Sequence, residues 1–131
     1  MDDSERGLTT LVSPHPVQET LKRLEDLIVA RGLKLFARID HGGEAEEAGL
    51  KMNPAQLLIF GSPVAGTPIM VAAPTSAIDL PLKVLVWGSD DGAVHVTYNN
   101  PEYLGWRHGI PSELLKNIMG VRPLVEKALA S

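Results

Sequence analysis

The stretch from Gly61 to Thr67 has residue types and a spacing that could bind phosphate. Gly61 and Gly66 are separated by four residues and Thr67 follows directly, close to the P-loop pattern G-x-x-x-x-G-K-[ST]. The P-loop lysine is missing, and Pro63 and Pro68 each remove a backbone N–H that a phosphate cradle needs. We therefore expect a turn from a strand into a helix, with Thr67 as the N-cap and Pro68 as the first helical residue. An anion at the N-terminus of that helix is the alternative.

Histidines are a second source of chemistry. His41 has Asp40 and Glu44 close by in sequence and could share a metal ion or a proton with them. His108 ends a predicted short helix, and folding could bring it to His41 in a composite site. None of the four histidines forms an H-x-H or H-x-x-x-H pair, the spacings typical of metal ligands. The sequence therefore predicts no metal site and no cofactor.

Asp79 stands in an apolar setting, between Ile78 and Leu80. The simpler interpretation is a cap or turn acceptor that receives backbone N–H bonds. The functional alternative is a buried carboxyl group with a raised pKa, suited to acid–base catalysis.

The run around Tyr98, Tyr103 and Trp106 has the densest set of large side chains with polar tips. Such side chains bury an apolar body and keep a polar handle, which suits core, subunit interface or pocket wall. All three interpretations stay open from sequence alone.

Composition excludes several classes of protein. The net charge of -4 over 131 residues, without a basic run, argues against nucleic-acid binding. The absence of cysteine excludes disulfides and thiolate chemistry. No apolar stretch approaches the roughly 20 residues that span a bilayer, and the acidic start does not resemble a signal peptide. We expect a soluble, cytoplasmic protein without a membrane partner.

The elements that would position these residues follow from periodicity. Apolar residues at positions 17, 21, 24, 27 and 28 predict an amphipathic helix that ends at Gly32. Alternation predicts a half-buried strand over 33–40, with Phe36 as the exception, and a hairpin of strands 82–87 and 93–99 around an Asp-Gly turn. A continuous apolar run predicts a buried strand over 56–60.

The expected fold class is α+β. Short connections between strands favour a single two-layer domain over 7–131, after a flexible tail of residues 1–6. Its sheet would have about five mostly antiparallel or mixed strands, with helices mainly on one face.

The helix that runs into Gly32 is followed in order by IDH, LLIFGSPVAGT, IDLPLKVLVW and DDGAVHVTYNNPEYL. This ordered set of motifs resembles the domain of unknown function 302 family, also described as the TTHA1732-like fold. It implies a small α+β domain that dimerises, and it brings no known catalytic residues. His41, Asp79 and Tyr98 are the polar positions that match the family pattern.

Two functional hypotheses follow. The favoured one is a homodimeric module without catalysis that binds a small-molecule ligand or a partner, with Gly61, Gly66 and Thr67 as further candidate ligand-binding residues. Its self-contact would come from the hairpin and the aromatic segment 98–106. The alternative is an enzyme, or a metal- or haem-dependent protein, with a composite site around His41, Asp79 and Tyr98.

Overall fold

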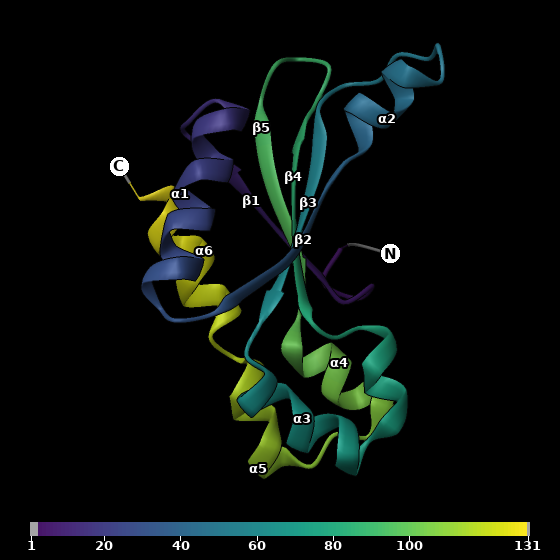
Figure 1. The fold of residues 1–131 in the computed structure, drawn as a ribbon, viewed down its shortest axis with the longest axis vertical. Coiled ribbons are helices and arrows are strands. Elements are labelled where there is room, and N and C mark those ends of the chain that lie inside the picture. Colours follow the sequence, from purple (N-terminus) through teal and green to yellow (C-terminus); the bar gives the residue numbers. More distant parts are fainter. Residues whose placement is uncertain (1–2, 131) are drawn as a thin grey trace.

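The fold is built on one antiparallel sheet of five strands (Figure 1). The structure, a computed structural model, describes residues 3–130. The strands are β1 (Leu8–Ser13), β2 (Lys34–Asp40), β3 (Ala55–Gly61), β4 (Leu82–Gly88) and β5 (Val94–Asn99), and their order in the sheet is β1-β5-β4-β3-β2. The α+β prediction is confirmed, and so is the hairpin, in which Val86 faces Val96 across β4 and β5. Gly92 closes its turn at φ +86°, a backbone conformation that glycine adopts without steric cost.

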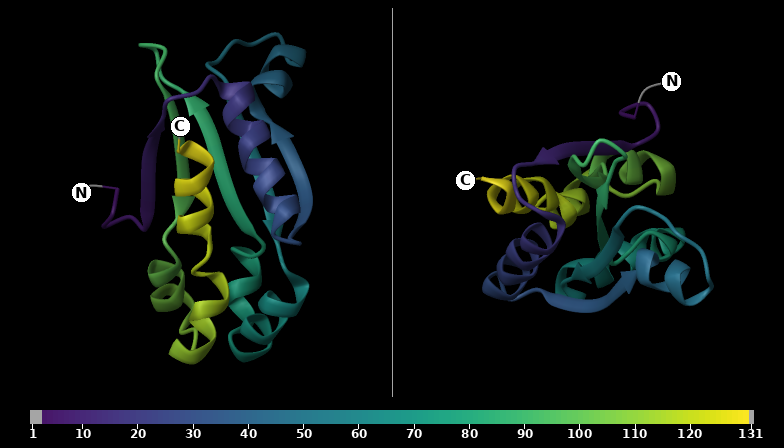
Figure 2. Two further views of the ribbon diagram at one scale, coloured as in Figure 1. Left: turned by 90° about the vertical axis from the view of Figure 1, so that its left-hand side faces the viewer. Right: turned by 90° about the horizontal axis from the view of Figure 1, so that it is seen from above.

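Two helices cover one face of the sheet. These are α1 (Val17–Ala30) and α6 (Val121–Leu129), which lie side by side over the sheet in both views of Figure 2. The helical stripe of α1 places Leu21, Leu24 and Ile28 at full burial. Together with the sheet they form what we call the main core, whose buried members are Leu21, Leu24, Ile28, Leu58, Phe60, Val84, Val86, Val96, Tyr98, Val121, Leu124, Val125, Ala128 and Leu129.

The remaining helices, apart from α2, gather at one end of the sheet, where they form what we call the end cluster (Figure 1). It consists of α3 (Pro63–Ala72), the 3₁₀ helix η1 (Pro74–Ile78), α4 (Pro101–His108), α5 (Ser112–Leu115) and the 3₁₀ helix η2 (Lys116–Ile118). A smaller end core lies inside it, formed by Ile69, Ala73, Leu80, Leu104, Ile110 and Ile118. The helix α2 (His41–Glu47) stands at the opposite end and buries none of its residues.

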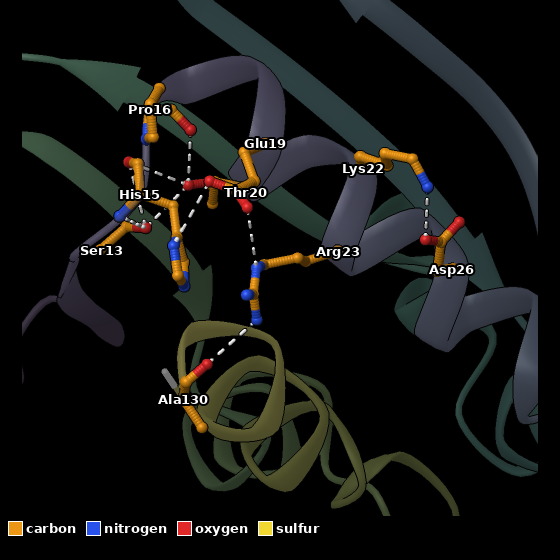
Figure 3. Close-up of polar contacts among 9 residues, drawn as sticks. All are labelled: Ser13, His15, Pro16, Glu19, Thr20, Lys22, Arg23, Asp26 and Ala130. Atoms are coloured by element: carbon orange, nitrogen blue, oxygen red, sulfur yellow. Dashed lines mark hydrogen bonds and ion pairs between the residues drawn. The ribbon is translucent and has the colours of Figure 1, made fainter.

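A polar network fixes the start of α1, as Figure 3 shows. The Ser13 and Thr20 hydroxyl groups lie 2.7 Å apart, and the backbone N–H of His15 donates to the Ser13 hydroxyl oxygen at 3.1 Å. Farther along α1, the Arg23 guanidinium group donates to the backbone carbonyl of Ala130 at 3.0 Å. These bonds tie the start of α1 to the end of β1, and the middle of α1 to the residue after α6.

Two local predictions are wrong. A bulge at Phe36 shifts the register of β2, so that Leu35 pairs with Phe60 but Ala37 pairs with Ile59. Because one extra residue reverses the side-chain alternation, Ala37 and Ile39 lie on the face opposite Leu35 and not beside it.

The helix after the glycine-rich stretch starts five residues earlier than expected. Ser62 is the N-cap of α3, its hydroxyl oxygen accepts from the Ala65 N–H at 3.3 Å, and Pro63 is the first helical residue. Thr67 and Pro68 lie inside the helix. Ser62-Pro63 offers the same cap chemistry as Thr67-Pro68 and comes first in the chain, directly after β3.

The face of the sheet opposite α1 and α6 has no helix across its middle among the described residues (Figure 1). We call it the open face. The strand registers and the burial pattern place Leu8, Thr10, Val12, Lys34, Ala37, Ile39, Ala55, Leu57, Ile59, Gly61, Lys83, Leu85, Trp87, His95, Thr97 and Asn99 on this face. No helix among residues 3–130 combines the length and the apolar composition that crossing a bilayer requires.

Candidate functional site

A cavity of about 530 Å³ lies between the main core and the end core. This volume falls within the range of roughly 300–1,000 Å³ that is typical of small-molecule sites. Its apolar lining comes from both cores and from residues between them, namely Leu33, Phe36, Phe60, Met70, Leu80, Pro81, Leu82, Ile118, Val121 and Leu124. A concave, mostly apolar space of this kind is the usual form of a ligand pocket.

The cavity exists because the elements around it end before they can fill it. Helix α1 stops at Ala30, and Gly32, at φ +71°, turns the chain away into β2. Helix α6 does not begin until Val121. The wall that α3 contributes includes Ala65 and Gly66, whose side chains are too small to reach across.

Four polar side chains line the cavity: Arg31, Ser62, Thr67 and Asn117. Two of them have local partners, because Ser62 caps α3 and the Asn117 amide donates to the Ala65 carbonyl at 3.1 Å. Arg31 is exposed, and its guanidinium group makes no hydrogen bond or ion pair among residues 3–130. It is the one charged residue among the described residues that line the cavity.

Three of the residues singled out in the sequence line this cavity: Gly61, Gly66 and Thr67. A Cβ atom at Gly66 would meet only the Met70 Cε atom, at 3.9 Å, so Gly66 leaves space on the cavity side. A Cβ atom at Gly61 would lie 3.5 Å from the Pro81 side chain. The glycine spacing that resembles a P-loop thus belongs to an apolar wall.

His41 and Tyr98 lie away from the cavity and from each other. His41 is exposed at the start of α2, after the end of β2 that pairs with Gln56, whereas the cavity lies at the Gly61 end of β3. Tyr98 is 3% exposed in the main core, on the face that α1 and α6 cover. Burial raises the pKa of its phenol.

Asp79 has partners that the sequence did not reveal. Its Oδ2 atom lies 2.5 Å from Nε2 of His108 and 3.1 Å from a guanidinium nitrogen of Arg107. The other imidazole nitrogen of His108, Nδ1, lies 2.9 Å from the Thr75 hydroxyl. The interpretation of Asp79 as an acceptor of backbone N–H bonds is therefore wrong, because its carboxylate binds the last two side chains of α4.

This hydroxyl–imidazole–carboxylate chain contains the group types of proton transfer. Its histidine side chain is only 4% exposed and its aspartate side chain 16% exposed. None of its members lines the cavity, and Asp79 has a second cationic partner in Arg107. In the fold, this chain of side chains joins η1 to α4. Leu80 and Pro81, which follow Asp79 in the sequence, belong to the cavity wall.

His108 and His41 do not meet, since His108 belongs to the end cluster and His41 to the opposite end of the sheet. Within residues 3–130 no group of three or more His, Asp or Glu side chains could hold a metal ion. Lys83, on the open face, donates to the backbone carbonyls of Asp79 and Pro81 at 3.1 and 3.2 Å. Burial lowers its pKa.

The family described as Domain of unknown function DUF302 matches residues 9–130. The chain belongs to the DUF302 family. A crystal structure of an uncharacterized conserved DUF302 protein from Bacillus stearothermophilus superposes with a TM-score of 0.78 over 94% of this chain and 95% of that one. At 18% identity this likeness shows a shared fold.

The curated relatives of this DUF302 chain are considerably longer than the chain itself. It is 41% identical over 104 residues to the Fluoride-specific ion channel FluC 1 of Brucella suis biovar 1, covering 79% of this chain and 41% of the relative. The FluC 1 protein of Brucella abortus biovar 1 matches at the same identity, with 38% of its length covered. The chain thus spans about two fifths of the length of these relatives.

Proposed function

We propose that this DUF302 domain is a homodimeric binding module for a small apolar ligand and not a catalyst. The observation that carries the proposal is the cavity between the two cores, because its lining is apolar and its volume suits a small molecule. Asp79, with its partners His108 and Arg107, and Tyr98 do not line this cavity, and His41 stands at the opposite end of the sheet. A catalytic site around His41, Asp79 and Tyr98 therefore has no shared space for a substrate.

The test is binding of the neutral fluorophore N-phenyl-1-naphthylamine, whose emission rises in an apolar site. We expect saturable binding to the wild-type protein and loss of binding in Gly66→Leu, since the new side chain would grow into the cavity beside Met70. Ala72→Leu adds bulk at an exposed position of the same helix and should bind as the wild type does. Equal binding by Gly66→Leu and wild type, with both folded by circular dichroism, would refute the proposal.

The open face supports the homodimer. It presents Leu57, Ile59, Leu85 and Trp87 across its middle strands, and the Lys, Arg, Asp or Glu residues on it among the described residues are Lys83 and, on the edge strand β2, Lys34. Five strands about 4.8 Å apart and about 20 Å long give a footprint of roughly 500 Å² for each protomer. This corresponds to a small interface, so we expect dissociation in the micromolar range.

Sedimentation equilibrium over a concentration series tests the dimer. Leu57→Lys should give a monomer at every concentration, because two copies would bury a new charge. Val29→Lys, on an exposed position of α1, should leave the dimer intact. A wild-type monomer at all concentrations, or a Leu57→Lys dimer as stable as the wild type, would contradict this arrangement.

A second candidate function is that of an accessory domain that responds to fluoride. It is favoured by the relatives named fluoride-specific ion channels, in which the region similar to this chain spans about two fifths of the length. We place such a domain in the cytoplasm, consistent with a chain that has no cysteine. Sodium fluoride should then raise the melting temperature where sodium chloride at equal ionic strength does not, and identical melting curves would rule out direct fluoride binding.

A further inference from the structure

We propose that the ligand of the cavity is an amphipathic monocarboxylate, an unbranched acid whose chain occupies the apolar space and whose carboxylate pairs with Arg31. This inference rests on the binding function proposed above and names the class of ligand. It depends on three features of the structure: the size of the cavity, the apolar nature of its lining, and the charge of Arg31, the one ionic residue of that lining within residues 3–130.

The size of the cavity limits the ligand. A water-sized group occupies roughly 30 Å³, so a space of about 530 Å³ has room for up to about fifteen to eighteen such groups. A saturated acid of ten to twelve carbons, as in decanoate or dodecanoate, is within this limit. A nucleotide or an oligosaccharide would leave its many polar atoms without partners on an apolar wall, at a high cost in free energy.

The charge of Arg31 determines which polar head group such an alkyl ligand would carry. Arg31 is a permanent cation, has no acidic partner among residues 3–130, and is accompanied in the cavity lining by no acidic residue. The nearby acids of α1 are already paired, Asp26 with Lys22 at 2.9 Å and Glu25 with Arg38 at 2.6 Å. A carboxylate at the mouth would therefore meet an available guanidinium group, whereas an ammonium group would be repelled.

The position of Arg31 also suits this role. It is the C-cap residue of α1, its backbone N–H donates to the Leu27 carbonyl at 3.0 Å, and Leu33, two residues later, is part of the cavity wall. The backbone at the rim is therefore fixed by the end of the helix. Its guanidinium group supplies planar donors that match the two oxygens of a carboxylate.

Titration calorimetry of the full chain with decanoate, decanol and decylammonium tests the proposal. We expect decanoate to bind about fivefold more tightly than decanol, the size of effect of an exposed ion pair, and decylammonium to bind most weakly. Arg31→Ala should reduce decanoate to the level of decanol, and Arg31→Lys should keep part of the preference. Raising the salt concentration should weaken decanoate binding to the wild type but not to Arg31→Ala.

The matched control is Lys116→Ala, which removes an exposed cation one residue before Asn117 without altering the cavity lining. It should keep the wild-type preference for decanoate. Equal affinities of decanoate and decanol for the wild type, or an unchanged preference in Arg31→Ala, would overturn the ligand class while leaving the cavity function standing. Failure of all three ligands and of the neutral fluorophore would overturn both proposals.

Discussion

The main core and the cavity differ in how completely side chains of the same kind are enclosed. In the main core Leu24, Val84 and Val86 have no exposed surface. Around the cavity Leu33, Met70 and Leu82 are only partly buried, although they are equally apolar. The difference comes from where α1 and α6 stop, not from the composition of the wall.

A small domain of this kind can have a cavity beside a completely filled core. The helices that cover the sheet run alongside its middle strands and leave the Gly61 end of β3 to a separate group of short helices. Each of the two cores is packed within itself, and the space between them is the one that neither group of helices fills. The following predictions, from the largest effect to the smallest, test whether the two regions respond differently.

The largest effect is expected from truncation in the filled region. Leu24→Ala should lower the free energy of unfolding by about 2–5 kcal/mol, because it creates a void among fully buried neighbours. Met70→Ala should cost less, about 1–2 kcal/mol, because Met70 is only partly buried and its truncation enlarges an existing space. Urea denaturation measures both, and equal losses would remove the distinction between filled and hollow regions.

The stability of the elements around the cavity should depend on the carboxylate of Asp79. Asp79→Asn should lower the free energy of unfolding by about 1–3 kcal/mol, because it weakens charge-assisted bonds to the buried His108 and to Arg107. Asp90→Asn, in the exposed hairpin turn, should change it by less than about 0.5 kcal/mol. Thermal melts of the two variants compare them directly, and similar melting temperatures would show that this tie adds little.

Glycine-to-alanine substitutions should stabilise the fold in the loosely packed environment and not in the tightly packed one. Gly66→Ala should raise the free energy of unfolding by about 0.5–1 kcal/mol, because it favours helix α3 and its Cβ would face open space. Gly105→Ala, in helix α4, would place its Cβ 3.2 Å from the Leu115 side chain and should gain nothing or lose stability. Gains of the same size in both variants would mean that packing is equally loose at the two sites.

The smallest effect should appear only at alkaline pH. Burial raises the pKa of Tyr98, so the folded state keeps its proton where an unfolded tyrosine, with a pKa of about 10, loses it. The contribution of Tyr98 to stability is therefore complete below pH ~10 and declines as the pH rises above that value. The lowered pKa of Lys83 has the opposite effect on the free energy of unfolding as the pH rises. This contribution is the same in the wild type and in Tyr98→Phe.

Urea denaturation between pH 8 and 11 measures the two profiles. We expect the free energy of unfolding to decline less steeply in Tyr98→Phe than in the wild type. Parallel profiles would show that the phenol titrates alike in the folded and the unfolded protein, and hence that this part of the main core is open to water.

Sequence patterns predicted the regular parts of the fold because those parts follow local rules. The spacing of Leu21, Leu24 and Ile28 marks the buried stripe of α1, and Ser89 to Gly92 form the turn of the hairpin. The bulge at Phe36 could not be predicted, because the bulged strand has apolar residues on both of its faces. The pattern of apolar residues therefore does not mark where the extra residue is inserted. The start of α3 was misplaced because two Ser/Thr-Pro pairs compete, and proximity to β3 decides between them.

The candidate site was only partly predictable for a related reason. Gly61, Gly66 and Thr67 drew attention through their spacing, and they line the cavity, but no pattern in the sequence indicates an empty space. The pairing of Asp79 with His108 joins residues 29 positions apart, and it depends on how η1 and α4 pack. Contacts between distant elements and the voids between them are properties of the assembled chain.

Helix α2 has a consequence for how the domain opens. It buries none of its residues, and its cap is a local bond from the Gly43 N–H to the Asp40 carboxylate at 2.9 Å. Unfolding it therefore exposes almost no apolar surface, and its amides should exchange with deuterium far sooner than those of β3 or β4. The same independence makes this segment a place where residues can be inserted, or another domain attached, without disturbing either core.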